Sequence, residues 1–182
     1  MNITPTFEAE GCLKMKEDQK MNLGLTNIWE IVCYDSNGAE KWREKKKNLI
    51  VTEGLNHVLS STFDAATQVT AWYVGLKAAG SVAAGDTMSS HSGWAENTDY
   101  SQSVRQTLTL GTAASGSIDN VGNLATYSIN GTATIAGAFV TSNNTKSGTS
   151  GTLYGAVDFS SARSVISGDT LTVTVTLTAA SA

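Results

Sequence analysis

A strict alternation of apolar and polar residues is the feature of this sequence that most limits how the chain can fold. Residues 171–177 read Leu-Thr-Val-Thr-Val-Thr-Leu. Successive side chains of a β-strand point to opposite faces of a sheet, so this pattern places Leu and Val on one face and Thr on the other. The sequence therefore predicts β-strands that each bury one face. Further strand-like runs lie at residues 71–76, 104–110, 124–129, 132–140 and 153–159.

Asn-Gly pairs separate two sets of these runs. One pair, at residues 37–38, lies between a run rich in β-branched and aromatic side chains at residues 28–34 and a second run at residues 39–44. Asn-Gly readily adopts the positive φ of a tight turn, so residues 28–44 are predicted to form a β-hairpin. The second pair, at residues 130–131, predicts another hairpin between the runs on either side of it.

One segment has the period of a helix instead. Leu55, Val58, Leu59 and Phe63 are spaced at i, i+3, i+4 and i+8, which places them on one side of a helix. The spacing predicts a short amphipathic helix over residues 52–63. No other segment of the sequence shows a comparable pattern.

These elements together indicate the fold class. Eight or nine strands with frequent turn signals are typical of a mainly β protein and not of alternating βαβ units. We therefore expect an antiparallel β-sandwich or a jelly-roll-like barrel with one short helix. At 182 residues the chain is long enough for one domain with a substantial core.

Charge is distributed unevenly along the chain. Residues 1–53 carry 8 Lys or Arg and 9 Asp or Glu, which is 17 of the 28 charged side chains. In the remainder, Ser and Thr supply most of the polarity. We expect an N-terminal extension or arm at residues 1–27 and a single β-rich domain at residues 28–182, with its β body at residues 71–178.

Composition argues against several classes of function. A net charge of −4 lacks the basic field with which proteins bind nucleic acids. The lysines at 45–47 have Glu40, Glu44 and Glu53 nearby, which favours a solvated hairpin edge. No apolar run is long enough to cross a membrane, and the first residues do not resemble a secretory signal, so we expect synthesis in a cytoplasm.

The two histidines offer little support for catalysis. His91 could form a Ser-His-Asp site with Asp86, but the sequence has no G-x-S-x-G motif, and a packed loop histidine is the more common role. His57 lies within the predicted helix. A cation between Asp86 and Glu96 is disfavoured because the intervening residues lack the ligand spacing of a calcium loop. No catalytic residue is predicted.

The two cysteines, Cys12 and Cys33, are most simply read as reduced thiols. A disulfide between them and a metal site are the alternatives, although neither cysteine lies close in sequence to a histidine. No phosphate-binding loop is present, so no cofactor or metal is expected. Trp72, Tyr73 and Trp94 are consistent with sugar binding, but aromatic residues on strands are more often part of a core.

Several short motifs resemble those of small virion proteins of tailed phages, some of which are capsid cement or decoration proteins while others are associated with tails. The resemblance extends from about residue 28 to the C-terminus. Its principal element is Asn-Leu-Ile-Val-Thr-Glu-Gly-Leu-Asn at residues 48–56, preceded by the predicted hairpin. The other motifs lie at residues 71–76, 86–94, 100–105, 137–139 and 151–155.

This resemblance implies a non-enzymatic role in the virion, after assembly in the host cytoplasm. The expected function is that of a capsid cement or decoration protein, which stabilises the head by binding across capsid subunits. Its expected partners are the major capsid protein or another virion protein, and further copies of itself in a dimer or trimer. The alternatives are a protein associated with the tail, a fibre or the head–tail connector, and a carbohydrate-binding β-sandwich.

Overall fold

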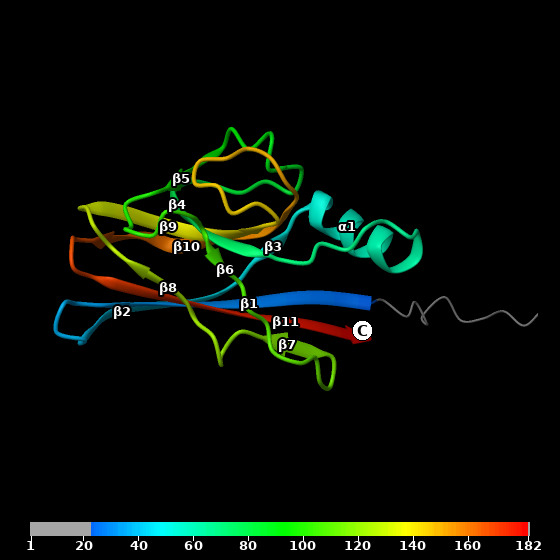
Figure 1. Cartoon of the computed structure of the whole chain (residues 1–182), viewed down its shortest axis with the longest axis horizontal. Helices are drawn as coiled ribbons and strands as arrows, with labels where there is room; N and C mark the ends of the chain where they lie inside the picture. Colours follow the sequence, from blue (N-terminus) through cyan, green and yellow to red (C-terminus); the bar gives the residue numbers. More distant parts are fainter. Residues whose placement is uncertain (1–22, 182) are drawn as a thin grey trace, which may run out of the picture.

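The computed structural model describes residues 23–181, which form two antiparallel sheets and one helix (Figure 1). Residues 1–22 and 182 lie outside the described part. The helix, α1 (Thr52–Phe63), lies between β3 and β4 in the chain. The strands are β1 (Leu23–Tyr34), β2 (Glu40–Lys47), β3 (Leu49–Ile50), β4 (Tyr73–Gly80), β5 (Trp94–Asn97), β6 (Gln106–Thr107), β7 (Ser117–Asp119), β8 (Ala125–Ser128), β9 (Ala133–Thr141), β10 (Leu153–Val165) and β11 (Thr170–Ser181).

The first sheet has the order β2-β1-β11-β7, and β8 also pairs with β11. β1 and β11 pair along their whole lengths, from Leu23 opposite Ser181 to Tyr34 opposite Thr170. The first and the last strand of the described chain thus form the centre of this sheet. The charged and the Ser/Thr-rich parts of the sequence therefore share one sheet, although their compositions differ.

The second sheet has the order β3-β10-β9-β4-β5, with β6 beside β4. Figure 1 shows the two sheets as separate layers, with α1 at the end of the sandwich where β1 begins and β11 ends. Among the described residues both sheets remain open at their edges. Of the two architectures expected from the sequence, the sandwich is therefore confirmed and the closed barrel is not.

The core fills the space between the two sheets, and the alternation in β11 is confirmed. Leu171, Val173 and Val175 are fully buried, while the threonines between them are only half-buried. On the neighbouring strand β1, Trp29 and Ile31 are fully buried in the same cluster. Burial of these apolar side chains, at about 25 cal/mol for each Å² removed from water, is the main favourable term that holds the sheets together.

The hairpin predicted at residues 28–44 is also confirmed. β1 and β2 pair in antiparallel register, and Gly38 in their turn has a φ of 83°. β1 begins earlier than predicted, because its pairing with β11 extends back to Leu23. Residues 23–27 therefore belong to the first sheet and not to the extension predicted at residues 1–27, the rest of which lies outside the described residues.

The hairpin predicted at residues 130–131 is wrong. β8 pairs with β11 in the first sheet, whereas β9 pairs with β10 and β4 in the second. At the end of β8, the Ile129 amide donates to the Asp169 carbonyl at 2.8 Å, and the Gly168 amide donates to the Ile129 carbonyl at 2.9 Å. These long-range bonds outweigh the local turn preference of Asn-Gly, so the chain crosses here from one sheet to the other.

α1 confirms the helix predicted at residues 52–63 and lies directly on the backbone of β10. A Cβ atom at Gly54 would lie 2.0 Å from the Tyr154 carbonyl oxygen. The Glu53 carboxylate adds a second link, because it accepts hydrogen bonds from the backbone amides of Met88 and Leu153. The start of the helix is thus fixed to the second sheet by close backbone contact.

The apolar stripe of α1 is only partly covered by the described chain. Val58 packs against the main core. Leu55, Leu59 and Phe63 instead remain 40%, 55% and 79% exposed. An exposed row of large apolar side chains on one helix is a common mark of an interaction surface.

No helix among residues 23–181 has both the length and the apolar character that a membrane span requires.

Candidate functional site

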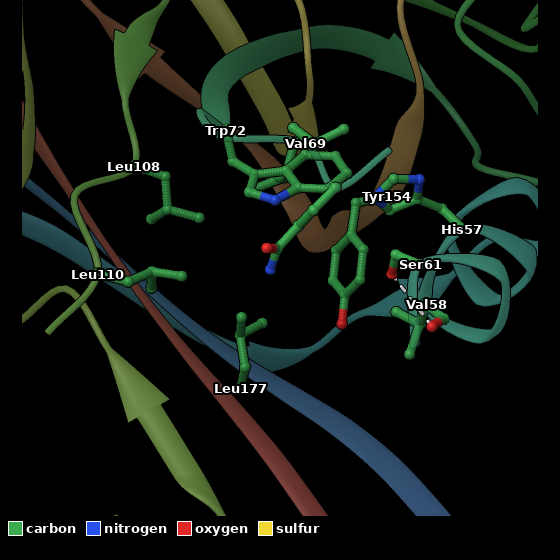
Figure 2. A pocket seen from close by; sticks show the side chains of 11 residues that line it. His57, Val58, Ser61, Val69, Trp72, Leu108, Leu110, Tyr154 and Leu177 are labelled. Carbon is green, nitrogen blue, oxygen red and sulfur yellow. Dashed lines mark hydrogen bonds between the residues drawn. The ribbon is translucent and has the colours of Figure 1, made fainter. Parts of the chain in front are cut away.

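Two apolar surfaces adjoin each other at the end of the sandwich beside α1. The first, which we call the aromatic pocket, is shown in Figure 2 and has a volume of about 200 Å³. It is lined by α1, the connection from α1 to β4, the segment after β6, and strands from both sheets. The lining residues are His57, Val58, Ser61, Gln68, Val69, Trp72, Leu108, Leu110, Val140, Tyr154 and Leu177.

Aromatic rings form one side of the aromatic pocket. The centre of the Trp72 ring lies 5.4 Å from that of His57 and 5.6 Å from that of Tyr154, and both pairs are close to edge-to-face. This arrangement matches the charge distribution of aromatic rings and fixes their orientation. Burial raises the pKa of the Tyr154 hydroxyl, which therefore stays protonated and uncharged near neutral pH.

Leucine side chains form the facing side. Leu108 and Leu110 lie across the pocket from Tyr154, and Leu177 closes it from the first sheet (Figure 2). The Leu108 amide donates to the Trp72 carbonyl at 2.8 Å, which holds the two sides at a fixed separation. None of the described residues that line the pocket is Asp, Glu, Lys or Arg. The pocket is therefore suited to uncharged, apolar groups.

The second surface, which we call the apolar groove, runs along the outer side of α1 and has a volume of about 610 Å³. It shares Val58 with the aromatic pocket. Its apolar side chains come from β1, β3 and the exposed stripe of α1. The lining residues are Leu25, Thr26, Lys47, Asn48, Leu49, Ile50, Leu55, Val58, Leu59, Thr62 and Phe63.

A short basic edge borders the apolar groove. Lys47 lines the groove, and Lys45 and Lys46 precede it on β2, an edge strand of the first sheet. Within residues 23–181 none of these lysines forms an ion pair, whereas the neighbouring Arg43 pairs with Glu30 at 3.0 Å and Glu40 at 2.7 Å. The groove thus combines exposed apolar side chains with one lysine, Lys47, that forms no ion pair among the described residues.

The residues considered for catalysis lie elsewhere and have other partners. The Asp86 carboxylate accepts hydrogen bonds from the Trp94 indole at 2.9 Å and from the Ala83 amide at 2.9 Å. The His91 ring stacks on Trp94, with centres 4.1 Å apart. Both residues therefore hold Trp94 in place, and the structure does not join them in a hydrogen-bonded pair.

The acid considered as a cation ligand, Glu96, instead belongs to a buried ion pair. Arg105 is 1% exposed and bonds to both carboxylate oxygens of Glu96, at 3.0 and 2.8 Å. Its guanidinium also donates to the carbonyls of Asn143 at 2.9 Å and Gly148 at 2.8 Å. The pair fixes the loop between β9 and β10 to the second sheet. The sequence contains no local signal for this arrangement.

Cys33 lies in the core next to a second buried acid. Its thiol is fully buried and donates to the Asp169 carboxylate at 3.7 Å, and Asp169 is paired with Lys41 at 2.5 Å. Burial and the nearby Asp169 charge raise the pKa of the thiol to about 12. Among residues 23–181, no group of three or more His, Cys, Asp or Glu could hold a metal ion. Cys12 lies outside this range.

Cys33 is expected to resist thiol reagents in the folded protein. In a Cys12→Ser variant, which leaves Cys33 as the single thiol, a disulfide reagent at pH 8 should label no cysteine in buffer and one in denaturant. The reason is that the reactive thiolate is scarce well below a pKa of about 12 and the sulfur is covered. Fast labelling without denaturant would show that this part of the core opens readily.

The aromatic residues considered for sugar binding do not form one platform. Trp72 lines the aromatic pocket, whereas Trp94 is 6% exposed and packs against Phe139 in a separate cluster. Tyr73, the first residue of β4, is half-buried. The three rings therefore offer no shared exposed face.

No family model matches this chain, and no curated protein matches it.

Proposed function

We propose that this chain is a non-enzymatic structural protein of a tailed-phage virion, and that it acts as a capsid cement or decoration protein. The observation that carries the proposal is the apolar groove, with Leu55, Leu59 and Phe63 exposed beside it. Such a cluster of exposed apolar side chains around one groove is suited to binding another protein. The resemblance of residues 28–182 to virion proteins supports the capsid as the partner.

The chemistry of the groove indicates which capsid segment it binds. Leu59 and Phe63 favour an apolar strand or helix, and Lys47 favours one that carries Asp or Glu on its flank. Two packed sheets form a rigid body behind the groove, so docking restricts the motion of the capsid subunits that it joins. Because the protein binds the assembled shell, it stabilises that state by mass action.

Symmetry extends the proposal to the number of copies. A protein that occupies equivalent positions on an icosahedral head meets other copies around the symmetry axes, so a dimer or trimer is the expected form on the particle. Location on the particle separates the cement role from a tail, fibre or connector role. Cryo-electron microscopy of intact virions should show the chain distributed over the head lattice. Density confined to a ring or fibre at the tail would overturn the cement role.

A charge placed in the apolar groove is expected to prevent attachment. Leu59→Glu should weaken binding to heads assembled without this protein by at least about tenfold, because the carboxylate must be desolvated against an apolar and acidic partner. Leu59 is 55% exposed, so the free energy of unfolding should change by less than about 0.5 kcal/mol. Co-sedimentation with the heads measures the binding.

A matched control is Val121→Glu, which adds the same charge at a residue that is 62% exposed and does not line the groove. This variant should sediment with heads as the unmodified chain does. Equal binding by the Leu59→Glu and Val121→Glu variants would exclude the groove as the attachment surface.

A further inference from the structure

The aromatic pocket is large enough to hold a small molecule. Protein interiors pack as densely as organic crystals and leave few voids larger than a water molecule. The aromatic pocket opens to solvent, and its volume of about 200 Å³ is far larger than such a void. For comparison, an apolar cavity of about 150 Å³ engineered in another protein binds benzene.

The walls of the pocket are held in place by contacts that do not depend on a ligand. Trp72 is oriented by its edge-to-face contacts with His57 and Tyr154, and its carbonyl accepts a hydrogen bond from the Leu108 amide. Tyr154 lies on β10, which also supports the start of α1. A preformed pocket binds a rigid ligand without a further ordering cost, so flat and rigid molecules are favoured.

The lining also determines the polarity of the ligand. Without a charged lining residue, a bound ion would be desolvated and left unpaired, which is costly. Gln68 is exposed and offers an amide donor and acceptor, and His57 offers ring nitrogens. The Ser61 hydroxyl is already bonded to the Val58 carbonyl at 3.2 Å. One polar group on an otherwise apolar ligand can therefore form a hydrogen bond with Gln68 or His57.

We propose that the aromatic pocket binds a small uncharged aromatic molecule with one hydrogen-bonding group, its ring held between Trp72 and Tyr154 on one side and the leucines on the other. The bicyclic ring of indole, with its single N–H, has this chemistry and serves as the probe. This binding activity goes beyond the role on the capsid and does not depend on it, because it concerns the isolated chain.

Titration of the isolated full chain with indole tests the proposal. The resonances of the Trp72 and His57 rings should shift and saturate with a dissociation constant at or below about 1 mM. Indole-3-carboxylate, which adds a negative charge to the same ring, should bind at least about tenfold more weakly. An absence of saturable shifts up to the solubility limit of indole would overturn the proposal, as would equal binding of the two compounds.

A pair of leucine substitutions locates the site. Leu110→Phe places extra atoms inside the pocket and should weaken indole binding at least about tenfold, whereas Leu124→Phe makes the same change at a residue that is 44% exposed and does not line it. Val69→Phe fills the pocket from the connection between α1 and β4. It provides a second test if the Leu110→Phe variant does not fold. Folding of each is checked by circular dichroism. Unchanged indole affinity in both the Leu110→Phe and the Val69→Phe variant would overturn the assignment of the pocket. That result would leave the proposed attachment to heads untouched, because attachment is tested separately at the groove.

Discussion

Replacing Arg105 with alanine is expected to lower the free energy of unfolding by about 3–5 kcal/mol, because the change leaves a buried carboxylate without its partner. Glu96 would retain the Ser147 amide at 2.7 Å as a donor but lose both bonds from the guanidinium. The carbonyls of Asn143 and Gly148 would lose their donor as well. The guanidinium also lies 5.1 Å from the centre of the Phe139 ring, so a cation–π contact is lost.

Urea denaturation measures this effect, and an exposed arginine provides the control. Arg43→Ala breaks ion pairs with Glu30 and Glu40, but the Arg43 side chain is 42% exposed, so its loss should cost no more than about 1 kcal/mol. Changing Glu96 to glutamine in the Arg105→Ala variant should restore part of the lost stability, because the unpaired charge is removed. Similar losses in the Arg105 and Arg43 variants would show that burial does not strengthen the first pair.

The elements predicted correctly from the sequence are those whose formation is decided within a few residues. The hairpin at residues 28–44 depends on a β-turn that Gly38 permits. The helix α1 depends on apolar residues spaced three or four positions apart. The alternation in β11 needs only one buried face. In each case the local preference and the long-range packing favour the same structure, so the pattern is sufficient.

The errors occur where pairing with a strand distant in sequence determines where a strand begins and ends. The alternating run at residues 104–110 contributes only the two-residue strand β6, because β4, its partner, begins at Tyr73 opposite Thr107, and only the Leu108 amide continues the contact, to the Trp72 carbonyl. β10 extends beyond the predicted residue 159 to Val165, since β9 pairs with its second half after an irregularity in register. Neither outcome follows from residues close in sequence, since each depends on a partner strand.

The site is harder to predict than the fold, for the same reason. His57 and Trp72 attract notice individually as a helix histidine and a strand-like aromatic residue. Their partners Leu110, Tyr154 and Leu177 lie on segments far apart in the sequence, so no spacing marks them as neighbours. The exposure of the stripe on α1 is equally hidden, because the same pattern describes a helix that is covered and one that binds another protein.

Gly54→Ala is the second change with a large expected effect, and its sign is opposite to that expected for an ordinary helix. In an exposed helix interior, alanine is more stabilising than glycine by about 1 kcal/mol. Here the new Cβ atom would lie 2.0 Å from the Tyr154 carbonyl oxygen and 2.9 Å from its Cα, both backbone atoms that no rotamer change can move. We expect the free energy of unfolding to fall by about 1–3 kcal/mol, as for other overpacked sites.

The same substitution connects the fold to both surfaces, because α1 can relieve the contact only by moving away from β10. Such a movement shifts His57 and Val58 in the aromatic pocket and Leu59 in the apolar groove, so indole binding and attachment to heads should both weaken. Gly85→Ala is the control, since a Cβ atom there meets nothing within 4 Å and stability should change by less than about 0.5 kcal/mol. A stability gain in the Gly54→Ala variant would contradict this expectation. It would mean that the helix preference of alanine outweighs the contact, and that α1 does not lie as close to the Tyr154 backbone as described.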